Sequence, residues 1–449
     1  MKPISQALPA SIAAAALALL LSGCGAAPST VAPPITVPGS ALSGRVFGGS
    51  QPISGATIQL YAVGTTGYGS AATALIHSSI TSGPVTSGTD GSFSISNDYT
   101  CTADPLVYIV ATQGNPGLST SSANNPYIAL MAALGPCSSL SASTHILLNE
   151  MTTVGSVYAL APFMADTAHV GTTASNQAGL VNAFGAVKEL TDVSSGTTPG
   201  PSLPANATLS AAPISTIANI VSSCVNSPGG TQGDGGACDL LFSGTTIQSA
   251  RPSDTVAALL SMAKNPGHNV TPLWNLRPSQ SPFQPTLAAQ PTDWTLAINH
   301  VGGGLNTPQG IAVDASGDLW LPNKGNGSVT ELSPTGAPLS PPTGYPGLSN
   351  PAALAIDTTG TIWIANQGAG TGNSSLAKMS PSGSVLATYT GGGLNLPASV
   401  AIDASGNIWL ANSGASTVSA FTPSGTPLSQ TGFTGAGLNN ALSVAIDPQ

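Results

Sequence analysis

Four aspartates in the last third of the sequence are the carboxylates most regularly placed to do chemistry. They are Asp314, Asp357, Asp403 and Asp447, and they follow one another at intervals of 43, 46 and 44 residues. A carboxylate can act as a general acid or base, or it can ligate a metal ion. A catalytic site, however, needs residues that occur once in a fold, whereas these aspartates occupy the same position in every copy of a repeat. The sequence therefore favours a structural role for them and predicts no catalytic residue, no metal ligand and no cofactor.

Two further residue types were considered as candidates for catalysis. Glu150 stands alone in the apolar segment 145–165, where a carboxyl group could have a raised pKa. The alternative, which the sequence favours, is that Glu150 caps backbone groups or bonds the hydroxyl of Thr152 or Thr153. The histidines are scattered, and none lies inside a complete copy of the repeat: His77, His145, His169, His268 and His300. The sequence also lacks HExxH, GxSxG, Walker and CxxC motifs.

The repeats themselves predict how the aspartates are held. The copies are PQGIAVDASGDLWLPN (308–323), PAALAIDTTGTIWIAN (351–366) and PASVAIDASGNIWLAN (397–412), and a fourth begins at 441–447. A period of about 44 residues matches a four-stranded β-propeller blade. Asp followed by a Ser/Thr-Gly pair predicts a hairpin turn after the inner strand. On the second strand we expect a Trp that fills the space between blades and an Asn that ends the strand: Trp320, Trp363 and Trp409, and Asn323, Asn366 and Asn412.

These copies resemble NHL repeats and the related propellers of gluconolactonases and virginiamycin lyases. The resemblance covers residues 291–449 and implies a partial propeller, because only three blades are complete and a closed ring needs at least four. We therefore expect that the chain continues further or that it closes by self-association. In the lactonase relatives acidic and amide side chains hold a metal in the central channel, and in the lyase relatives a histidine acts there. An envelope lyase or lactonase with its site in missing blades is thus the alternative function.

The N-terminus predicts export and a lipid anchor. Residues 1–23 contain a short apolar stretch after Lys2, as in a secretory signal. Leu21-Ser22-Gly23-Cys24 resembles the lipobox of bacterial lipoproteins, which implies that Cys24 carries the lipid; ordinary secretion is the alternative. Residues 24–40 form a Pro-rich tether, and Gly25 after the cysteine hints at the outer membrane, on its periplasmic or its outer side.

With Cys24 assigned to the anchor, four cysteines remain for an oxidising compartment. Four cysteines allow three connectivities, and the sequence cannot choose among them. The local choice pairs Cys101 with Cys137 and Cys224 with Cys238.

The region between the tether and the repeats divides into a β-rich and a helical part. Residues 41–115 resemble the carboxypeptidase regulatory-like, or prealbumin-like, β-sandwich, which implies a structural or adhesive module. Residues 116–290 predict a helical and loop-rich segment, with helices at 145–165, 176–190, 213–225 and from Ser253 or Asp254 to Lys264. The fold class is therefore mainly β with a helical middle segment.

The charge balance limits the partners. The chain carries 8 Lys and Arg against 17 Asp and Glu, with no basic cluster, so nucleic-acid binding is not expected. We expect a membrane-anchored extracytoplasmic scaffold or binding protein without catalysis, whose propeller contacts a protein, a glycan or a small ligand.

Overall fold

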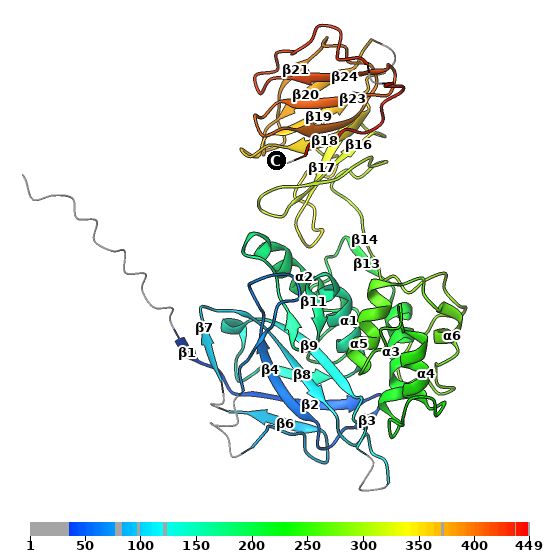
Figure 1. Cartoon of the computed structure of the whole chain (residues 1–449). Helices are drawn as coiled ribbons and strands as arrows, with labels where there is room; N and C mark the ends of the chain where they lie inside the picture. The colour runs from blue at the N-terminus through cyan, green and yellow to red at the C-terminus, as the bar shows by residue number, and fades with distance from the viewer. Residues whose placement is uncertain are drawn as a thin grey trace, which may run out of the picture.

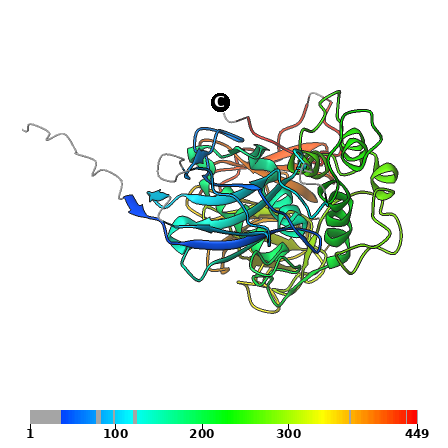
Figure 2. The ribbon, with the colours of Figure 1, turned by 90° about the horizontal axis from the view of Figure 1, so that it is seen from below.

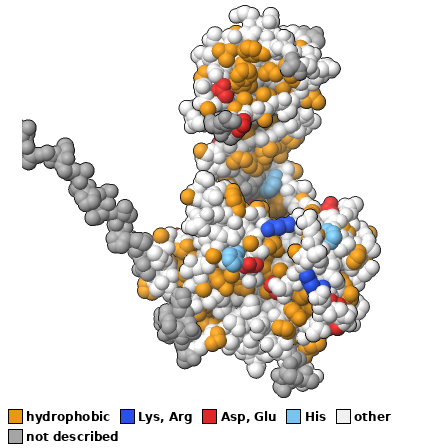
Figure 3. Space-filling view, in the orientation of Figure 1, with side chains coloured by type: hydrophobic (Ala, Val, Ile, Leu, Met, Phe, Trp, Pro, Cys, Tyr) orange, Lys and Arg blue, Asp and Glu red, His pale blue; other side chains and the backbone are white. Residues whose placement is uncertain are grey.

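The computed structural model describes residues 36–76, 83–96, 99–119, 124–369, 372–435 and 437–447 (Figure 1). Cys24 and the export signal lie outside these residues. The chain forms an N-terminal body, residues 36–300, and a repeat region, residues 301–447, which lies above the body in Figure 1. The fold is mainly β. Charged side chains are sparse over both parts on the face seen in Figure 3.

Two four-stranded sheets form the first half of the body. One contains β2 (Leu42–Gly48), β3 (Gln51–Pro52), β6 (Ser92–Ile95) and β10 (His145–Leu148); the other has the order β5-β4-β8-β9. The strands of the second sheet are β4 (Thr57–Ala62), β5 (Thr73–Ala74), β8 (Leu106–Thr112) and β9 (Ala129–Pro136). A small ladder joins β1 (Thr36–Pro38) to β7 (Thr100–Thr102). Burial alternates along β2, as in a strand with one covered face, whereas β8 and β9 are buried almost throughout.

Six α-helices complete the body: α1 (Glu150–Leu160), α2 (Gln177–Leu190), α3 (Ala211–Val225), α4 (Ala237–Gly244), α5 (Thr255–Lys264) and α6 (Val270–Trp274). Between α1 and α2 lie the short segments η2 (Ala161–Phe163), β11 (Met164–Asp166), β12 (His169–Val170) and η3 (Ala174–Asn176), and η1 (Cys137–Ser139) lies between β9 and β10. Helices α3, α4 and α6 lie to one side of the sheets in both views (Figures 1 and 2). No helix among the described residues is both long enough and apolar enough to cross a bilayer.

Hydroxyl groups of the helices bond to strand β9. Thr153 Oγ1 accepts the N–H of Met131 and Ser156 Oγ accepts that of Ala133, both at 3.0 Å. Thr255 Oγ1 of α5 accepts the N–H of Ala129, also at 3.0 Å. The backbone donors on the side of β9 away from β8 thus find acceptors on α1 and α5.

One sequence expectation for the body needs correction. The segment expected as one helix at 145–165 begins as strand β10, which pairs in parallel with β2, and the helix starts only at Glu150. An apolar run without a polar face does not distinguish a buried strand from a buried helix, and the capping box of Asn149 and Thr152 sets the boundary. Strands β9 and β10, which follow residue 115, complete the two sheets, and one buried cluster extends from Leu42 to Trp294.

The other expected helices are present as α2, α3 and α5. Asp254 caps α5 by accepting the N–H of Ala257 at 2.8 Å. Both disulfides of the local choice are formed, Cys101 with Cys137 and Cys224 with Cys238.

The repeat region contains three antiparallel sheets in sequence. Sheet 1 has β15 (Ala312–Val313), β16 (Leu319–Asn323) and β17 (Ser328–Leu332). Sheet 2 has β18 (Pro351–Ile356), β19 (Ile362–Asn366), β20 (Ser375–Met379) and β21 (Val385–Tyr389). Sheet 3 has β22 (Pro397–Ile402), β23 (Ile408–Asn412) and β24 (Thr417–Phe421). Strand β14 (Ile298–His300) pairs with β13 (Ala207–Leu209) and leads from the body into sheet 1.

Candidate functional site

Three of the repeat aspartates, Asp314, Asp357 and Asp403, accept the same set of three hydrogen bonds. One oxygen of Asp357 accepts the indole N–H of Trp363 at 3.0 Å, and the other accepts the backbone N–H groups of Thr359 and Thr361 at 2.9 and 3.0 Å. Asp314 and Asp403 bind their tryptophan and the residues two and four positions later in the same way. These carboxylates therefore hold the turn between two strands to the tryptophan of the second strand.

The hydrogen bonds also favour the charged form of two of these carboxyl groups, Asp357 and Asp403. At Asp403 the bond from Trp409 leads the contributions that lower the pKa of the carboxyl below its ordinary value. At Asp357 burial acts to raise the pKa, but the bonds from Thr359, Trp363 and Thr361 outweigh it and lower the pKa. A carboxylate stabilised in its charged form by three donors is a weak base and suits a structural role.

The asparagines at the strand ends connect the sheets to the preceding loops. Asn323 Nδ2 donates to Ser328 Oγ and Thr330 Oγ1 at 3.1 and 2.8 Å, and its Oδ1 accepts the N–H of Asn306 at 3.1 Å. Asn412 repeats this arrangement with Thr417, Ser419 and Asn395. Asn366 makes one long bond, to Ser375 Oγ at 3.4 Å, and its buried Oδ1 has no hydrogen-bond partner among the described residues. Asp447 is the last described residue.

The tryptophans pack between sheets and against a second aromatic residue. Trp320 lies in the cluster between sheets 1 and 2, and Trp363 in the cluster between sheets 2 and 3. The rings of Trp320, Trp363 and Trp409 lie 5.8, 6.1 and 5.7 Å from those of Tyr345, Tyr389 and Phe433. The sequence analysis missed these three partners, although they follow the repeat aspartates at a nearly constant interval.

Sheet 1 alone has an additional acidic cluster. Carboxylate oxygens of Asp314, Asp318 and Glu331 lie within 4.8 Å of one another. The positions of Asp318 and Glu331 are held by Thr361 and Lys378 in sheet 2 and by Asn407 and Ala420 in sheet 3. Acids therefore also occur in the repeats at positions that the other two copies do not share.

Two acids of this cluster, Asp318 and Glu331, are protonated more readily than usual. Burial, and then the charge of Asp314, raises the pKa of Asp318. Burial also raises the pKa of Glu331, together with Asp318 and Asp314, while a 2.7 Å bond from the Tyr345 hydroxyl opposes the rise. Such a group could share protons or hold a hard cation through its oxygens.

Glu150 has a backbone partner distant in the sequence. Its carboxyl group is buried at the start of α1, and its two oxygens accept the N–H of Gly49 at 3.1 and 3.0 Å. Burial raises the pKa of Glu150 to about 7. The hydroxyl groups of Thr152 and Thr153 bond to other residues. Of the two structural partners expected for Glu150, a backbone group and a threonine hydroxyl, the carboxyl group therefore bonds the backbone group.

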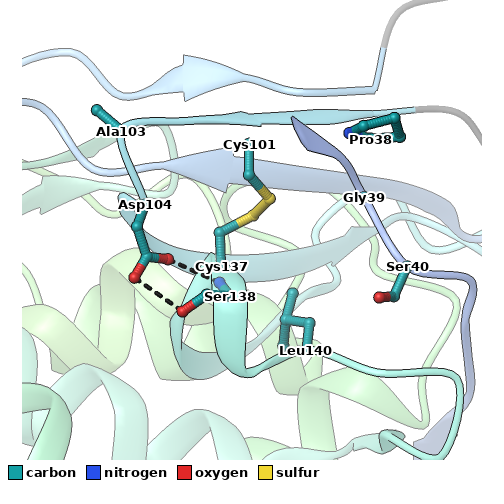
Figure 4. Close-up of a pocket in the computed structure, with 9 residues that line it drawn as sticks. All are labelled: Pro38, Gly39, Ser40, Cys101, Ala103, Asp104, Cys137, Ser138 and Leu140. Carbon is teal, nitrogen blue, oxygen red and sulfur yellow. Dashed lines mark hydrogen bonds between the residues drawn. A yellow bond between two sulfur atoms is a disulfide. The ribbon is translucent and has the colours of Figure 1, made fainter. Parts of the chain in front are cut away.

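A cavity of about 390 Å³ lies beside the Cys101–Cys137 disulfide, where residues 38–40 enter the body (Figure 4). Asp104 is the only charged residue in its lining, and its oxygens accept the N–H and the hydroxyl of Ser138 at 2.7 and 2.8 Å. The cavity thus offers mainly apolar and backbone surface.

No protein-family model and no curated protein sequence matches the chain. Among solved structures, the chain is similar to virginiamycin B lyase from Staphylococcus aureus, with 19% identity over 27% of this chain and 39% of that chain and a TM-score of 0.22. It is also similar to a chain of the nidogen/laminin complex, with 21% identity over 31% and 52% and a TM-score of 0.24. A third neighbour is a functionally unknown protein from Desulfotomaculum acetoxidans, with 15% identity over 34% and 52% and a TM-score of 0.27. The chain spans about half or less of the length of these neighbours.

Proposed function

We propose that the chain is an exported binding or scaffold protein that a lipid on Cys24 holds at the bacterial outer membrane. Residues 41–115 act in this proposal as a sandwich module that carries the repeat region, a part of a β-propeller. The propeller contacts a protein, a glycan or a small ligand. The observation that carries the proposal is that Asp314, Asp357 and Asp403 each use both carboxylate oxygens to hold the repeat together.

Export is supported by the cysteines. The two disulfides, Cys101–Cys137 and Cys224–Cys238, fit an oxidising compartment outside the cytoplasm. Residues 24–40 would then give the body freedom to move relative to the membrane surface.

The test is metabolic labelling of cells with a radioactive fatty acid, followed by separation of membranes from soluble fractions. The wild-type chain should carry the label and sediment with the membranes. Cys24→Ser should lose both properties, whereas the matched variant Gly25→Ala should retain the label. A Cys24→Ser chain that still carries label would refute the anchor.

The acidic cluster of sheet 1 favours a second candidate, a lactonase or lyase. The lactonase relatives use acidic side chains to hold a metal, and Asp318 and Glu331 are acids that occur once in the repeats. Asp318→Asn should abolish lactone cleavage if this candidate is correct. The scaffold proposal expects no turnover of a lactone substrate by the wild-type chain, with or without added Ca²⁺.

A further inference from the structure

Two hollows adjoin on the surface of the body, beside the sheet that contains β2 and β10. The first, which we call the Arg45 hollow, has a volume of about 380 Å³, and the second, the Lys188 hollow, has a volume of about 370 Å³. His145 and Ser194 line both hollows, which together form what we call the basic groove. Each volume lies within the range of about 300–1,000 Å³ that is typical of small-molecule sites. The groove therefore has room for a ligand of two or more units.

The strand pattern places the side chains of the Arg45 hollow. Burial alternates along β2, so Arg45 and Phe47, two residues apart, point away from the core. Strand β10 pairs in parallel with β2 and puts Leu147 beside Arg45, and His145 lies on the same side of β10 as Leu147. A guanidinium group, an aromatic ring and an imidazole thus line one side of the sheet.

Lys188 supplies the cation of the second hollow. It lies in the last turn of α2, and its Nζ approaches Gly135 in β9, where a Cβ atom would lie 3.2 Å from it. The lack of a side chain at Gly135 therefore leaves room for the ammonium group. Lys188 is half-buried and makes no ion pair with another residue that the structure describes. Its positive charge can thus act on a ligand.

Among the described residues, Asp192 is the only acid that lines the groove, and its carboxylate is already bonded. It accepts the N–H and the hydroxyl of Ser194 at 2.8 and 2.7 Å and the hydroxyl of Ser195 at 2.9 Å. Burial acts to raise the pKa of Asp192, but these bonds outweigh it and lower the pKa. The carbonyl oxygen of Val193 accepts the N–H of Leu147 at 2.8 Å, which holds this loop beside β10. Asp192 therefore shapes the wall of the groove.

The acids near the groove offset its positive charge only weakly. Arg45 lies 3.8 Å from Asp90, but both side chains are more than half exposed, and such a pair contributes little in water. Glu150 lies behind Gly49 and outside the lining, and burial raises its pKa. Arg45 and Lys188 are two of the 8 Lys and Arg in a chain that has 17 acids. The groove therefore collects positive charge on an acidic protein, and the walls of a cleft strengthen such a potential.

Hydroxyl groups make up much of the remaining polar lining. They belong to Ser139, Ser143, Thr144, Thr191 and Ser194. A hydroxyl donates one hydrogen bond and accepts two, so groups that bond within the chain keep capacity for a ligand. Ser139, for example, donates to the carbonyl oxygen of Pro136 at 2.6 Å and still has its lone pairs. The lining therefore matches a ligand with many hydroxyl groups, whose C–H faces can pack on Phe47 and Leu140.

We propose that the basic groove binds an acidic oligosaccharide, with the carboxylate groups of successive uronate units on Arg45 and Lys188. A guanidinium group can bind a carboxylate through two parallel hydrogen bonds, and an ammonium group binds it as a point charge. The serine and threonine hydroxyls bond the hydroxyl groups of the sugar. An acidic peptide carries the same charge but few hydroxyl groups, so it would leave this part of the lining unused. The site lies in the body and depends neither on the lipid nor on the role proposed for the repeat region.

The experiment is isothermal titration calorimetry of trigalacturonate into the full chain with Cys24→Ser, which keeps the chain free of lipid. Trigalacturonate should bind at one site per chain, and the affinity should fall as the ionic strength rises. Arg45→Met and Lys188→Met should each weaken binding at least about tenfold, because each removes a charge-assisted contact. Lys324→Met, which removes an exposed charge from the repeat region, is the matched control and should leave the affinity unchanged.

Three other ligands test the chemical class. Methyl-esterified trigalacturonate lacks the charge, triglutamate lacks the hydroxyl groups, and inorganic phosphate lacks the extended shape. Each should bind at least about tenfold more weakly than trigalacturonate.

Failure of trigalacturonate to bind, or equal binding of any of the three other ligands, would overturn the proposal. A loss of affinity in the Lys324→Met chain as large as in the Lys188→Met chain would do the same, because it would indicate attraction by overall charge. Circular dichroism confirms that each variant is folded, and Arg45→Met changes an exposed residue, so it tests the groove even if Lys188→Met unfolds. Labelling of Cys24 tests the anchor separately.

Discussion

The N-terminal body and the repeat region are stabilised in different ways. In the body, key contacts occur once and join residues far apart in the sequence, as in the bonds from Gly49 to Glu150 and from Ala129 to Thr255. In the repeat region, the same short-range contacts recur in each sheet, as in the bonds from Trp320, Trp363 and Trp409 to their aspartates. Each of these contacts in the body can be removed at one place only. In the repeat region, the same amino-acid substitution can be made at equivalent positions of different sheets, and the resulting losses of stability can be compared.

The largest effect expected from such a comparison is at the tryptophans. Trp363→Ala should lower the free energy of unfolding of the repeat region by about 3–5 kcal/mol, because it leaves a cavity between sheets 2 and 3. Trp409→Ala should cost clearly less, because Trp409 is partly exposed. Urea unfolding of the two variants, followed by tryptophan fluorescence, measures the difference. Equal losses would mean that Trp409 is covered in solution.

A change in the body should alter how stability depends on pH. Glu150 has a folded pKa of about 7, above its ordinary value of 4.5, so between these values the unfolded state loses its proton while the folded state retains it. Stability should therefore fall as the pH rises from 4.5 to 7, by an amount on the order of 3 kcal/mol. Glu150→Gln should remove the part of this dependence that Glu150 contributes, because an amide does not titrate, and its oxygen can still accept the N–H of Gly49. Glu189, whose pKa burial also raises to about 7, should keep its own part.

Urea unfolding at pH 5 and at pH 7.5 provides the measurement. Asp90→Asn, a substitution at an exposed turn, serves as the control and should leave the decline between the two pH values in place. An unchanged decline in the Glu150→Gln chain would contradict the assignment.

The same substitution at equivalent aspartates should change the free energy of unfolding by different amounts, because Asp314 belongs to the acidic cluster. Asp357→Asn removes a charged acceptor of four hydrogen bonds and should lower the free energy of unfolding by about 1–3 kcal/mol. Asp314→Asn should cost less, since it also removes repulsion with Asp318 and Glu331. Thermal unfolding of the two variants at pH 7 compares them, and an equal or larger loss for Asp314→Asn would argue against repulsion in the cluster.

The smallest expected effect concerns the asparagines. Asn323→Ala breaks three side-chain hydrogen bonds, whereas Asn366→Ala breaks one long bond and removes an unpaired buried oxygen. Asn323→Ala should therefore be the more destabilising substitution, by about 1 kcal/mol. Differential scanning calorimetry can resolve this difference, and a reversed order would show that Asn366 has a partner that the hydrogen bonds above do not include.

The contrast also explains what the sequence could predict. The recurring Asp, Trp and Asn could be assigned to turns and strands, since each position is seen three times and its partners lie within a few residues. Glu331 was missed because its bond from Tyr345 joins β17 to the loop that follows it, and because Lys378 and Ala420 occupy the position of Glu331 in the other two sheets. Strand β10 was missed because its pairing with β2 spans about a hundred residues and leaves no local pattern.

The hydroxyl groups that bond to β9 have a consequence for how this chain behaves when concentrated. Thr153, Ser156 and Thr255 occupy the donors through which another strand could extend the sheet. Proteins commonly protect such edges with lysine, but only 6% of the residues here are charged. The chain thus blocks intermolecular β-pairing with neutral side chains, so this protection should persist at ionic strengths that screen charge repulsion.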